Sequence, residues 1–274
     1  MLRKLIKHEL RATARVMGPM LLLMLGAAVG GNVAVNHLVE SDVPALNVMG
    51  VFLLILFVAA IIGGFVMAFV LMIQRFYQNL LRDEGYLMMT LPATVHEHVL
   101  SKLFVSILWA AATAAAAVLS MSILVFELEF ASLVFEDLGA LLAQLRFGDL
   151  RLMDYTGHAV LFVLEMALLM IAMDACLCLQ IYAAMAVGHS FTHHKGLLSF
   201  AAYIVLCMLW NIVQNAALYL LGVVTPESIQ LELNISPMPA LHITLCLLIV
   251  CSMIPSALWY AITTYFLKNR LNLD

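Results

Sequence analysis

The sequence predicts an all-α polytopic membrane protein with six transmembrane helices, an N-terminal amphipathic interfacial helix and both termini in the cytoplasm. Hydrophobic residues make up 65% of the 274 residues and charged residues only 11%, with a mean hydropathy of +1.05. Soluble domains average about 45–50% apolar and about 25% charged residues, so the excess apolar side chains are expected to face lipid. They form long unbroken runs, whereas a membrane β-barrel would show short alternating segments.

Six of these runs reach the length of about 20 residues that a helix needs to cross the hydrocarbon core. The first run is too long for the apolar part of a signal peptide and lacks a clear small-residue cleavage site. All five cysteines fall inside the runs, which indicates apolar packing and no disulfide framework. The expected spans are 16–36, 48–73, 103–126, 159–187, 197–223 and 241–266, joined in one transmembrane domain over 16–266 and followed by a cytoplasmic tail, 267–274.

The distribution of basic residues gives the orientation of the spans. Eleven of the 13 lysines and arginines lie before span one, between spans two and three, between spans four and five, or after span six. Only Arg146 and Arg151 lie on the other side, where most of the acidic loop residues also fall. Because positive residues stay on the cytoplasmic side, both termini are expected inside the cell.

Residues 1–15 are expected to form an amphipathic helix of their own. Like charges in one row need an anionic surface nearby, which favours a helix lying along the inner leaflet. Anchoring of span one by its positive charge is a second, compatible role. Glu9 lies on the apolar side and indicates that part of this face meets protein. The apolar face carries Leu2, Leu5, Ile6 and Leu10, and the basic row carries Arg3, Lys7, Arg11 and Arg15.

Two stretches of small residues favour close helix packing in the membrane. Span one contains Gly26-Ala-Ala-Val-Gly30, a GxxxG pattern, and span three contains the run Ala110–Ala117. Contacts within the chain are preferred over contacts between chains, because six helices already need close interfaces. Outside the membrane, 127–158 shows helical periodicity, whereas the proline-rich loop Thr225–Ala240 is expected to be irregular.

The segment 75–102 between spans two and three is too elaborate for a passive linker. Span two is expected to continue as helix to Gly85, a good helix stop. Thr94-Val-His-Glu97 matches the S/T-x-x-E capping box, so a new helix is expected to start at Thr94 and lead into span three. Between the two helices lies an exposed apolar patch, Tyr86-Leu87-Met88-Met89, which Leu91-Pro92 ends. A tip with methionines and a tyrosine suits a groove on a partner protein.

Asp83 and Glu84 lie near the expected C-terminal end of the first of these two helices, where the helix dipole does not favour anions. Two explanations stay open. The carboxylates pair with Arg82 or with a basic group of a second protein, or they form a solvated charge cluster.

The chain resembles a known family over essentially its whole length. The segment after span two has the form RFYxNLxxDEGYLxxTLP, and the chain ends in LKNRLNLD. Together with the basic amphipathic start and six spans with both ends inside, these motifs look like a bacterial ABC-transporter permease of the type-2 exporter class. The segment after span two is the most specific part of the resemblance, and the LNLD ending supports it.

The resemblance implies that this segment, the coupling segment 75–102, contains the coupling helix that docks into a groove on the ATP-binding subunit. It makes His189–Gly196 a minor contact with that subunit and residues 1–15 the connecting helix beside it. It also implies two ATPase copies, a second identical or related permease chain, and a place among the lipids of the bacterial cytoplasmic membrane, with no nucleic-acid partner. The residues carried over as the docking element or its border are Arg82, Asp83, Glu84, Gly85, Tyr86, Leu91 and Pro92, with Leu87 in the patch between them.

The sequence contains no motif for catalysis, and the chain is not expected to be an enzyme. G-x-x-x-x-G-K-[ST] is absent, so no cofactor is expected in this chain, and ATP with Mg²⁺ would be held by the partner ATPase. His96-Glu97-His98 has the wrong spacing for two metal ligands on one helix face. His189, His193 and His194 are interpreted as an ordinary polar loop in preference to a metal site.

Span four carries two carboxylates, Glu165 and Asp174. A carboxylate at the bilayer centre costs about 2.5–3.5 kcal/mol, so each should face protein or water. They lie about 180° apart on the helix and cannot share one site. Glu165 is near enough to the outer end to reach water. Asp174 lines a translocation path, pairs with Asn211, Gln214 or Asn215 of span five, or is neutral and hydrogen-bonded.

These observations favour the membrane subunit of an ATP-driven exporter of an amphiphilic substrate, such as a peptide, a drug or a lipid-like molecule. Two alternatives remain. A proton-coupled secondary transporter would use Asp174 and Glu165, but it predicts inverted repeats and broken helices, which the sequence does not show. A membrane sensor or scaffold without transport would explain the coupling segment but not the polar residues of spans four and five.

Overall fold

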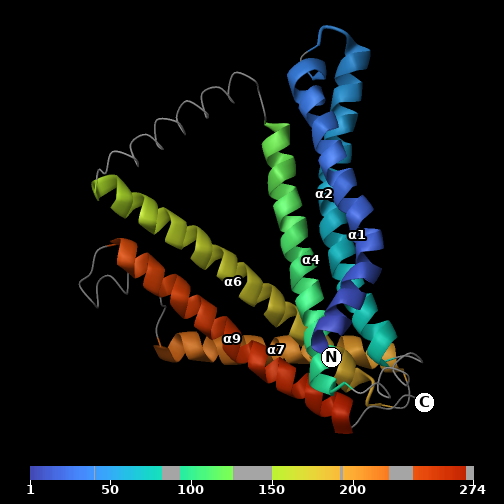
Figure 1. Ribbon diagram of the computed structural model, residues 1–274, viewed down its shortest axis with the longest axis vertical. Coiled ribbons are helices and arrows are strands. Elements are labelled where there is room, and N and C mark those ends of the chain that lie inside the picture. Colours follow the sequence, from blue (N-terminus) through green and yellow to red (C-terminus); the bar gives the residue numbers. More distant parts are fainter. Residues whose placement is uncertain (40, 82–92, 126–149, 192–193, 222–236, 270–274) are drawn as a thin grey trace. The chain divides into compact units, whose positions relative to one another are not determined.

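The computed structural model is all-α, as the composition predicts, and describes residues 1–39, 41–81, 93–125, 150–191, 194–221 and 237–269 (Figure 1). Short π-helical turns, η1 (Ala34–Leu38) and η2 (Tyr77–Leu81), extend the first two helices. The α-helices are α1 (Leu2–Val33), α2 (Pro44–Phe76), α4 (Val95–Leu124), α6 (Leu150–Gly188), α7 (Lys195–Leu221) and α9 (Pro237–Asn269).

Six of these helical segments are long and apolar enough to cross a membrane, which agrees with the six expected spans. Each expected span overlaps one α-helix, although the first runs past Val33 into η1, and the third and fifth extend slightly past the ends of α4 and α7. Two helices begin inside segments that were expected outside the membrane. α6 begins at Leu150, within 127–158. α9 begins at Pro237, inside the loop that was expected to be irregular, because proline fits the first turn of a helix where no N–H partner is required.

The N-terminal segment is not a separate helix in the structure. α1 runs from Leu2 to Val33 without a break, through both the expected interfacial segment and the first span, and Pro19 lies inside it. Gly18 and Pro19 follow the expected junction at Arg15 by three and four residues, and the helix continues through both of them. The amphipathic pattern itself is confirmed. Glu9 is buried with 6% of its surface exposed, the apolar residues Leu2, Leu5, Ile6 and Leu10 are half-buried, and Arg3, Lys7, Arg11 and Arg15 are exposed.

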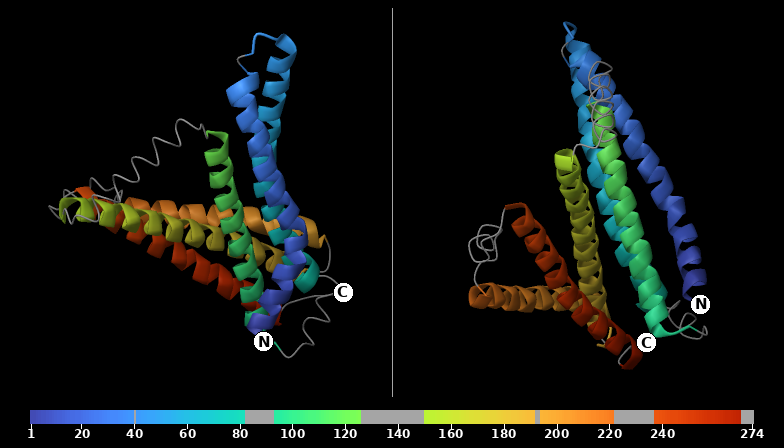
Figure 2. Two further views of the ribbon diagram at one scale, coloured as in Figure 1. Left: turned by 45° about the horizontal axis from the view of Figure 1, so that its top comes forward. Right: turned by 60° about the vertical axis from the view of Figure 1, so that its left-hand side comes forward.

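The described residues pack as two units. One consists of Lys7–Leu71 and Leu108–Tyr155, so it contains most of α1, α2 and α4. Trp109 Nε1 donates to Thr13 Oγ1 at 2.7 Å, and the Asn32 side chain donates to the Leu124 carbonyl at 3.2 Å. These two bonds join α1 and α4 within this unit, and they require the two helices to run in the same direction, with α2 returning beside them (Figure 2).

Glycines bring α1 and α2 together in this unit, and one of them belongs to the GxxxG pattern, because a Cβ added to Gly30 would lie 3.7 Å from Leu53 Cδ2 of α2. A Cβ added to Gly26 would meet nothing within 4 Å, so this residue makes no close approach to the rest of the described chain. By contrast, the side chain of Met24 lies directly against Gly64, and Met20 Cε lies 3.0 Å from the Cβ position of Gly63. The long methionine side chains of α1 therefore occupy space that glycines of α2 leave open.

The other unit consists of Met1–Ile6, Met72–Ile107 and Thr156–Asp274. It holds the lower end of α2 with η2, the first half of α4, and α6, α7 and α9. Its core centres on Tyr182 of α6, which is fully buried, stacks on Phe76 of α2 with ring centroids 4.0 Å apart, and hydrogen-bonds the Ser106 hydroxyl at 3.1 Å. The buried core residues are Met72, Phe76, Leu80, Leu81, Val99, Cys178, Leu179, Ile181, Tyr182, Ala183, Met185, Ala186, Trp259 and Leu267.

Candidate functional site

The sequence predicts a docking element between α2 and α4, and its key residues lie outside the part of the chain that the structure describes. This applies to Arg82, Asp83, Glu84, Gly85, Tyr86, Leu87, Leu91 and Pro92, which all fall within 82–92. The structure does describe the two helix ends that flank this stretch in the sequence, together with residues 189–191 and 194 of the loop between α6 and α7.

The helical segment that directly precedes residues 82–92 is π-helical and buried. η2 continues α2 over Tyr77–Leu81, and Asn79, Leu80 and Leu81 are all buried. A π-helical turn accommodates one more residue per turn than an α-helix, and such turns are rare and frequent at functional sites. Here the turn lies directly before the stretch 82–92, with Phe76 held against Tyr182 just above it.

The helix end that leaves the stretch has the predicted capping box. The Glu97 N–H donates to Thr94 Oγ1 at 3.3 Å, and the Thr94 N–H donates to Glu97 Oε2 at 3.0 Å. α4 accordingly starts at Val95, immediately after the cap. The second oxygen of the same carboxylate accepts from the Leu2 N–H at 3.3 Å, so Glu97 serves the first turns of both α1 and α4. The sequence predicted the box but not this second contact.

The loop between α6 and α7 is tied to η2 through His189. This imidazole is buried with 2% of its surface exposed, and its ring lies edge-on to Tyr77 with centroids 5.3 Å apart. His189 Nδ1 donates to the Met185 carbonyl at 2.9 Å and lies 3.3 Å from Ser199 Oγ. Burial lowers the pKa of His189 below its ordinary value, and the positive charge of Lys195 acts in the same direction.

Two of the three histidines of this loop, His189 and His194, lie in the part of the chain that the structure describes. His193 lies outside the described residues, and His194 has a positive φ of 55° at the start of α7. Within the described ranges, no group of three or more His, Cys, Asp and Glu residues is positioned to hold a metal ion.

The four polar residues predicted for a translocation path are not joined by the hydrogen bonds found among the described residues. Asp174 is half-buried and accepts from the Cys178 thiol of its own helix at 4.0 Å. Asn211 donates to the Cys207 carbonyl at 3.0 Å and Asn215 to the Asn211 carbonyl at 2.8 Å, so both amides bond to the backbone of α7. Asn211, Gln214 and Asn215 are all exposed. Structural pairing of Asp174 with these amides is thus not seen, and the three amides form an exposed polar stripe on α7.

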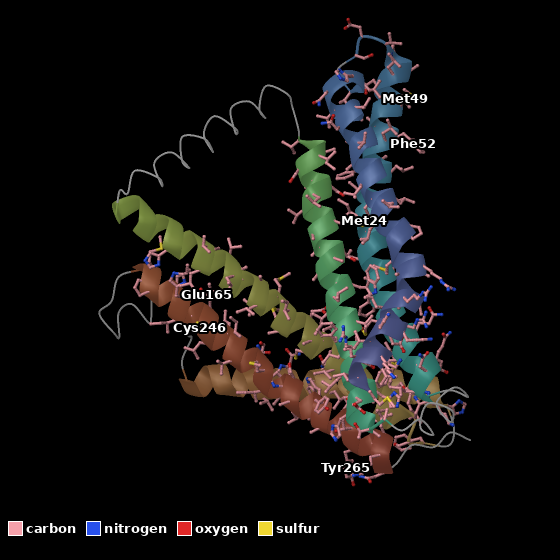
Figure 3. All side chains as sticks on the ribbon, in the orientation of Figure 1. Met24, Met49, Phe52, Glu165, Cys246 and Tyr265 are labelled. Carbon is pink, nitrogen blue, oxygen red and sulfur yellow. The ribbon has the colours of Figure 1, made fainter. Side chains whose placement is uncertain are left out.

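Glu165 differs from the expectation that it reaches water. Only 6% of its surface is exposed, and its Oε2 lies 2.7 Å from His242 Nδ1 of α9. Its Oε1 accepts from the Cys246 thiol at 3.8 Å, and Figure 3 labels Glu165 and Cys246 at neighbouring positions on α6 and α9. His242 Nε2 in turn lies 3.2 Å from His158 Nδ1. The position of His242 in the first turns of an apolar helix was the sequence signal for this contact, because a polar side chain there needs a polar partner.

Comparisons with known proteins add no assignment to this geometry. No protein-family model matches the chain, and neither the curated proteins nor the solved structures contain a significant match. The fold and composition define the class: an α-helical membrane protein with six candidate spans.

Proposed function

We propose that the chain is the permease subunit of an ATP-driven ABC exporter, in which a separate ATPase subunit hydrolyses ATP and docks on the coupling segment. The sequence of 75–92 supports this most specifically. The missing P-loop gives a reason for a docking element, because energy from ATP would have to enter from another chain. Two ATPase copies and a second permease chain, identical or related, would complete the assembly.

The observation that carries the proposal is that both helix ends next to 82–92 belong to one buried core. Phe76, Leu80 and Leu81 precede the stretch, and Val99 follows it. The same core contains Tyr182 of α6 and Trp259 of α9. Because a packed interior resists deformation, a push on the stretch would be passed to α6 and α9 and not absorbed locally.

The exposed stripe of α7 supports a polar path beside this core. Asn211 and Asn215 use their N–H groups on their own helix, so their amide oxygens are left for water, substrate or a second chain. An unsatisfied amide in hydrocarbon is costly, so the stripe is expected to face something other than lipid. Half-buried Asp174 would add a carboxylate to the same path. An amphiphilic substrate suits a mainly apolar surface with a few groups of this kind.

Site-directed cross-linking in native membranes tests the docking element. A single reactive cysteine at Tyr86 should cross-link to an ATPase subunit, whereas one at Asp42, in the loop between the first two spans, should not. Tyr86→Ala should reduce recovery of the ATPase by about thirtyfold, the cost of losing a hot-spot residue worth ~2 kcal/mol, while Asp42→Ala leaves recovery unchanged. The proposal fails if no ATPase is cross-linked at position 86 and if Tyr86→Ala and Glu84→Ala both leave function intact.

The buried pair of Glu165 and His242 favours a second candidate, proton-coupled secondary transport. A carboxylate held against an imidazole in a membrane helix is an arrangement that proton-driven transporters use. Asp174 would not share that site, because it lies nine residues further along α6, or roughly 13 Å. Proteoliposomes without ATPase separate the two functions. Uptake driven by an imposed proton gradient and lost in Glu165→Gln would support this candidate, and its absence would leave the exporter.

A further inference from the structure

His158 and His242 place two imidazole nitrogens side by side where α6 meets α9. His158 Nδ1 and His242 Nε2 are 3.2 Å apart, and the two rings are inclined by 21°. The other nitrogen of His242 lies 2.7 Å from Glu165 Oε2. The side chain of His242 is 12% exposed, whereas His158 is exposed. The three residues thus form a line from solvent to a buried carboxylate.

The donor and acceptor properties of these groups determine which nitrogen of His242 carries the hydrogen. When the Glu165 carboxyl group is ionised it can only accept, and His242 Nδ1 then carries the hydrogen that points to Glu165. A neutral imidazole then has its lone pair on the other nitrogen, and His242 Nε2 presents this lone pair toward His158. Histidines that bind metal ions in proteins show the same arrangement. Their second ring nitrogen donates to a carboxylate, which orients the ring and raises its basicity.

The distance between the two nitrogens also suits a metal ion. Zinc binds imidazole nitrogen at 2.0–2.1 Å in tetrahedral geometry, which places two such nitrogens about 3.3 Å from each other. The observed separation of 3.2 Å is close to this value. An ion could enter with little movement of either helix.

We propose that His158 and His242 form a binding site for a divalent transition-metal ion of the zinc class, with Glu165 as the carboxylate that orients His242. Imidazole ligands suit zinc, copper and nickel. The chain supplies two ligands, in keeping with the absence of a three-residue metal cluster among the described residues, and water completes the coordination at exposed His158.

Metal binding releases no net proton from the two histidines. In the metal-free state His158 Nδ1–H donates to His242 Nε2. On binding, His158 moves this hydrogen to its own Nε2 through water, and both facing nitrogens donate lone pairs to the ion. The metal replaces one hydrogen bond by two coordinate bonds and ties α6 to α9.

The position of the site indicates where the ion comes from. His158 directly precedes the candidate span Val160–Gly188, and His242 lies near the start of the candidate span Met238–Asn269. Both are at the helix ends opposite to the loop that contains His189. By the distribution of basic residues these are the external ends, so the ion would be taken from the outer solution.

Titration of the purified full-length chain with Co²⁺, followed by displacement with Zn²⁺, tests the site. The protein carries an affinity tag without histidine and is first treated with EDTA. Wild type should develop the visible absorption of protein-bound Co²⁺, and Zn²⁺ should abolish it and raise the melting temperature. His158→Asn should lose both responses, and Glu165→Gln should bind 10–100-fold more weakly, the usual effect of removing an orienting partner. His37→Ala, which removes an exposed histidine of η1, is the matched control and should behave as wild type.

Two results would overturn the proposal. One is a Co²⁺ response of wild type that His158→Asn leaves unchanged, and the other is no response in wild type at all. His158 is exposed, so its variant folds even where His242→Gln does not. The metal alone is the probe and no ATPase is present, so the result does not depend on the exporter proposal.

Discussion

Gly188→Ala is expected to open the corner between α6 and α7. Gly188 is the last residue of α6, and a Cβ added there would overlap the Cα, the backbone nitrogen and the hydroxyl of Ser199 on α7. Two of these three atoms belong to the backbone and cannot turn away as a flexible side chain could. The helices would have to separate by roughly 1 Å or more to restore ordinary carbon contacts.

The cost follows from what this separation breaks. The corner also holds His189, which bonds the Met185 carbonyl, approaches Ser199 and packs against Tyr77 of η2. Overpacking of a core costs about 1–3 kcal/mol, and a backbone overlap belongs at the upper end. A loss of about 3 kcal/mol corresponds to a melting temperature lower by roughly 6–12 °C for a chain of this size.

Gly196→Ala, in the first turn of α7, is the matched control. A Cβ there would meet nothing within 4 Å, so the change should leave the melting temperature unchanged or raise it slightly, since alanine favours helix over glycine by about 1 kcal/mol. Unfolding can be followed by the intrinsic fluorescence of Trp210 and Trp259, whose rings lie in the same unit with centroids 6.3 Å apart.

A third variant isolates the cause. Ser199→Ala combined with Gly188→Ala removes only the hydroxyl overlap, so the pair should remain close to Gly188→Ala in stability. Equal melting temperatures for Gly188→Ala and Gly196→Ala, or full recovery in the double variant, would refute the argument from backbone overlap.

Three further outcomes are expected. Thr94→Ala should lower the free energy of unfolding by about 1 kcal/mol through loss of the α4 cap, measured by thermal unfolding. The loss should persist in a Glu97→Ala background, because the Thr94 hydroxyl bonds the backbone N–H of residue 97. The free energy of unfolding should fall as the pH drops below the ordinary imidazole pKa of about 6.5. Burial lowers the pKa of His189 in the folded state, so the unfolded state binds more protons in this pH range. His189→Gln should flatten this part of the pH profile, and an unchanged profile would contradict the role of His189. Trp109→Phe should cost about 1 kcal/mol by removing the bond to Thr13, and a Thr13→Val background should abolish most of that cost in a double-mutant cycle.

The parts of the fold that depend on local pattern followed from the sequence. Six apolar runs gave six helices, because lipid requires every backbone group to be satisfied within the segment. The capping box at Thr94 and Glu97 was also confirmed, since both of its bonds are made within four residues.

The parts that depend on distant residues did not follow. His242 is 77 residues from Glu165, and nothing in either segment marks the other as its partner. The GxxxG pattern identified only part of the contact for the same reason. Gly30 meets Leu53 of α2 whereas Gly26 meets nothing within 4 Å, and this depends on how α1 and α2 are rotated against each other. The junction at Arg15 was drawn from the change in polarity, which alters the surroundings of a helix without ending it.

The extra residue in η2 has a consequence for reading the coupling segment. One residue occupies about 100° of an α-helical turn, so a π turn shifts the angular phase of everything after it by about that amount. A helical wheel continued from α2 with α-helical geometry would therefore assign Leu81, at the end of η2, to the wrong side. Deleting one residue within 77–81 should be tolerated, because the shortened segment can form an ordinary α-helical turn that keeps the phase of α2.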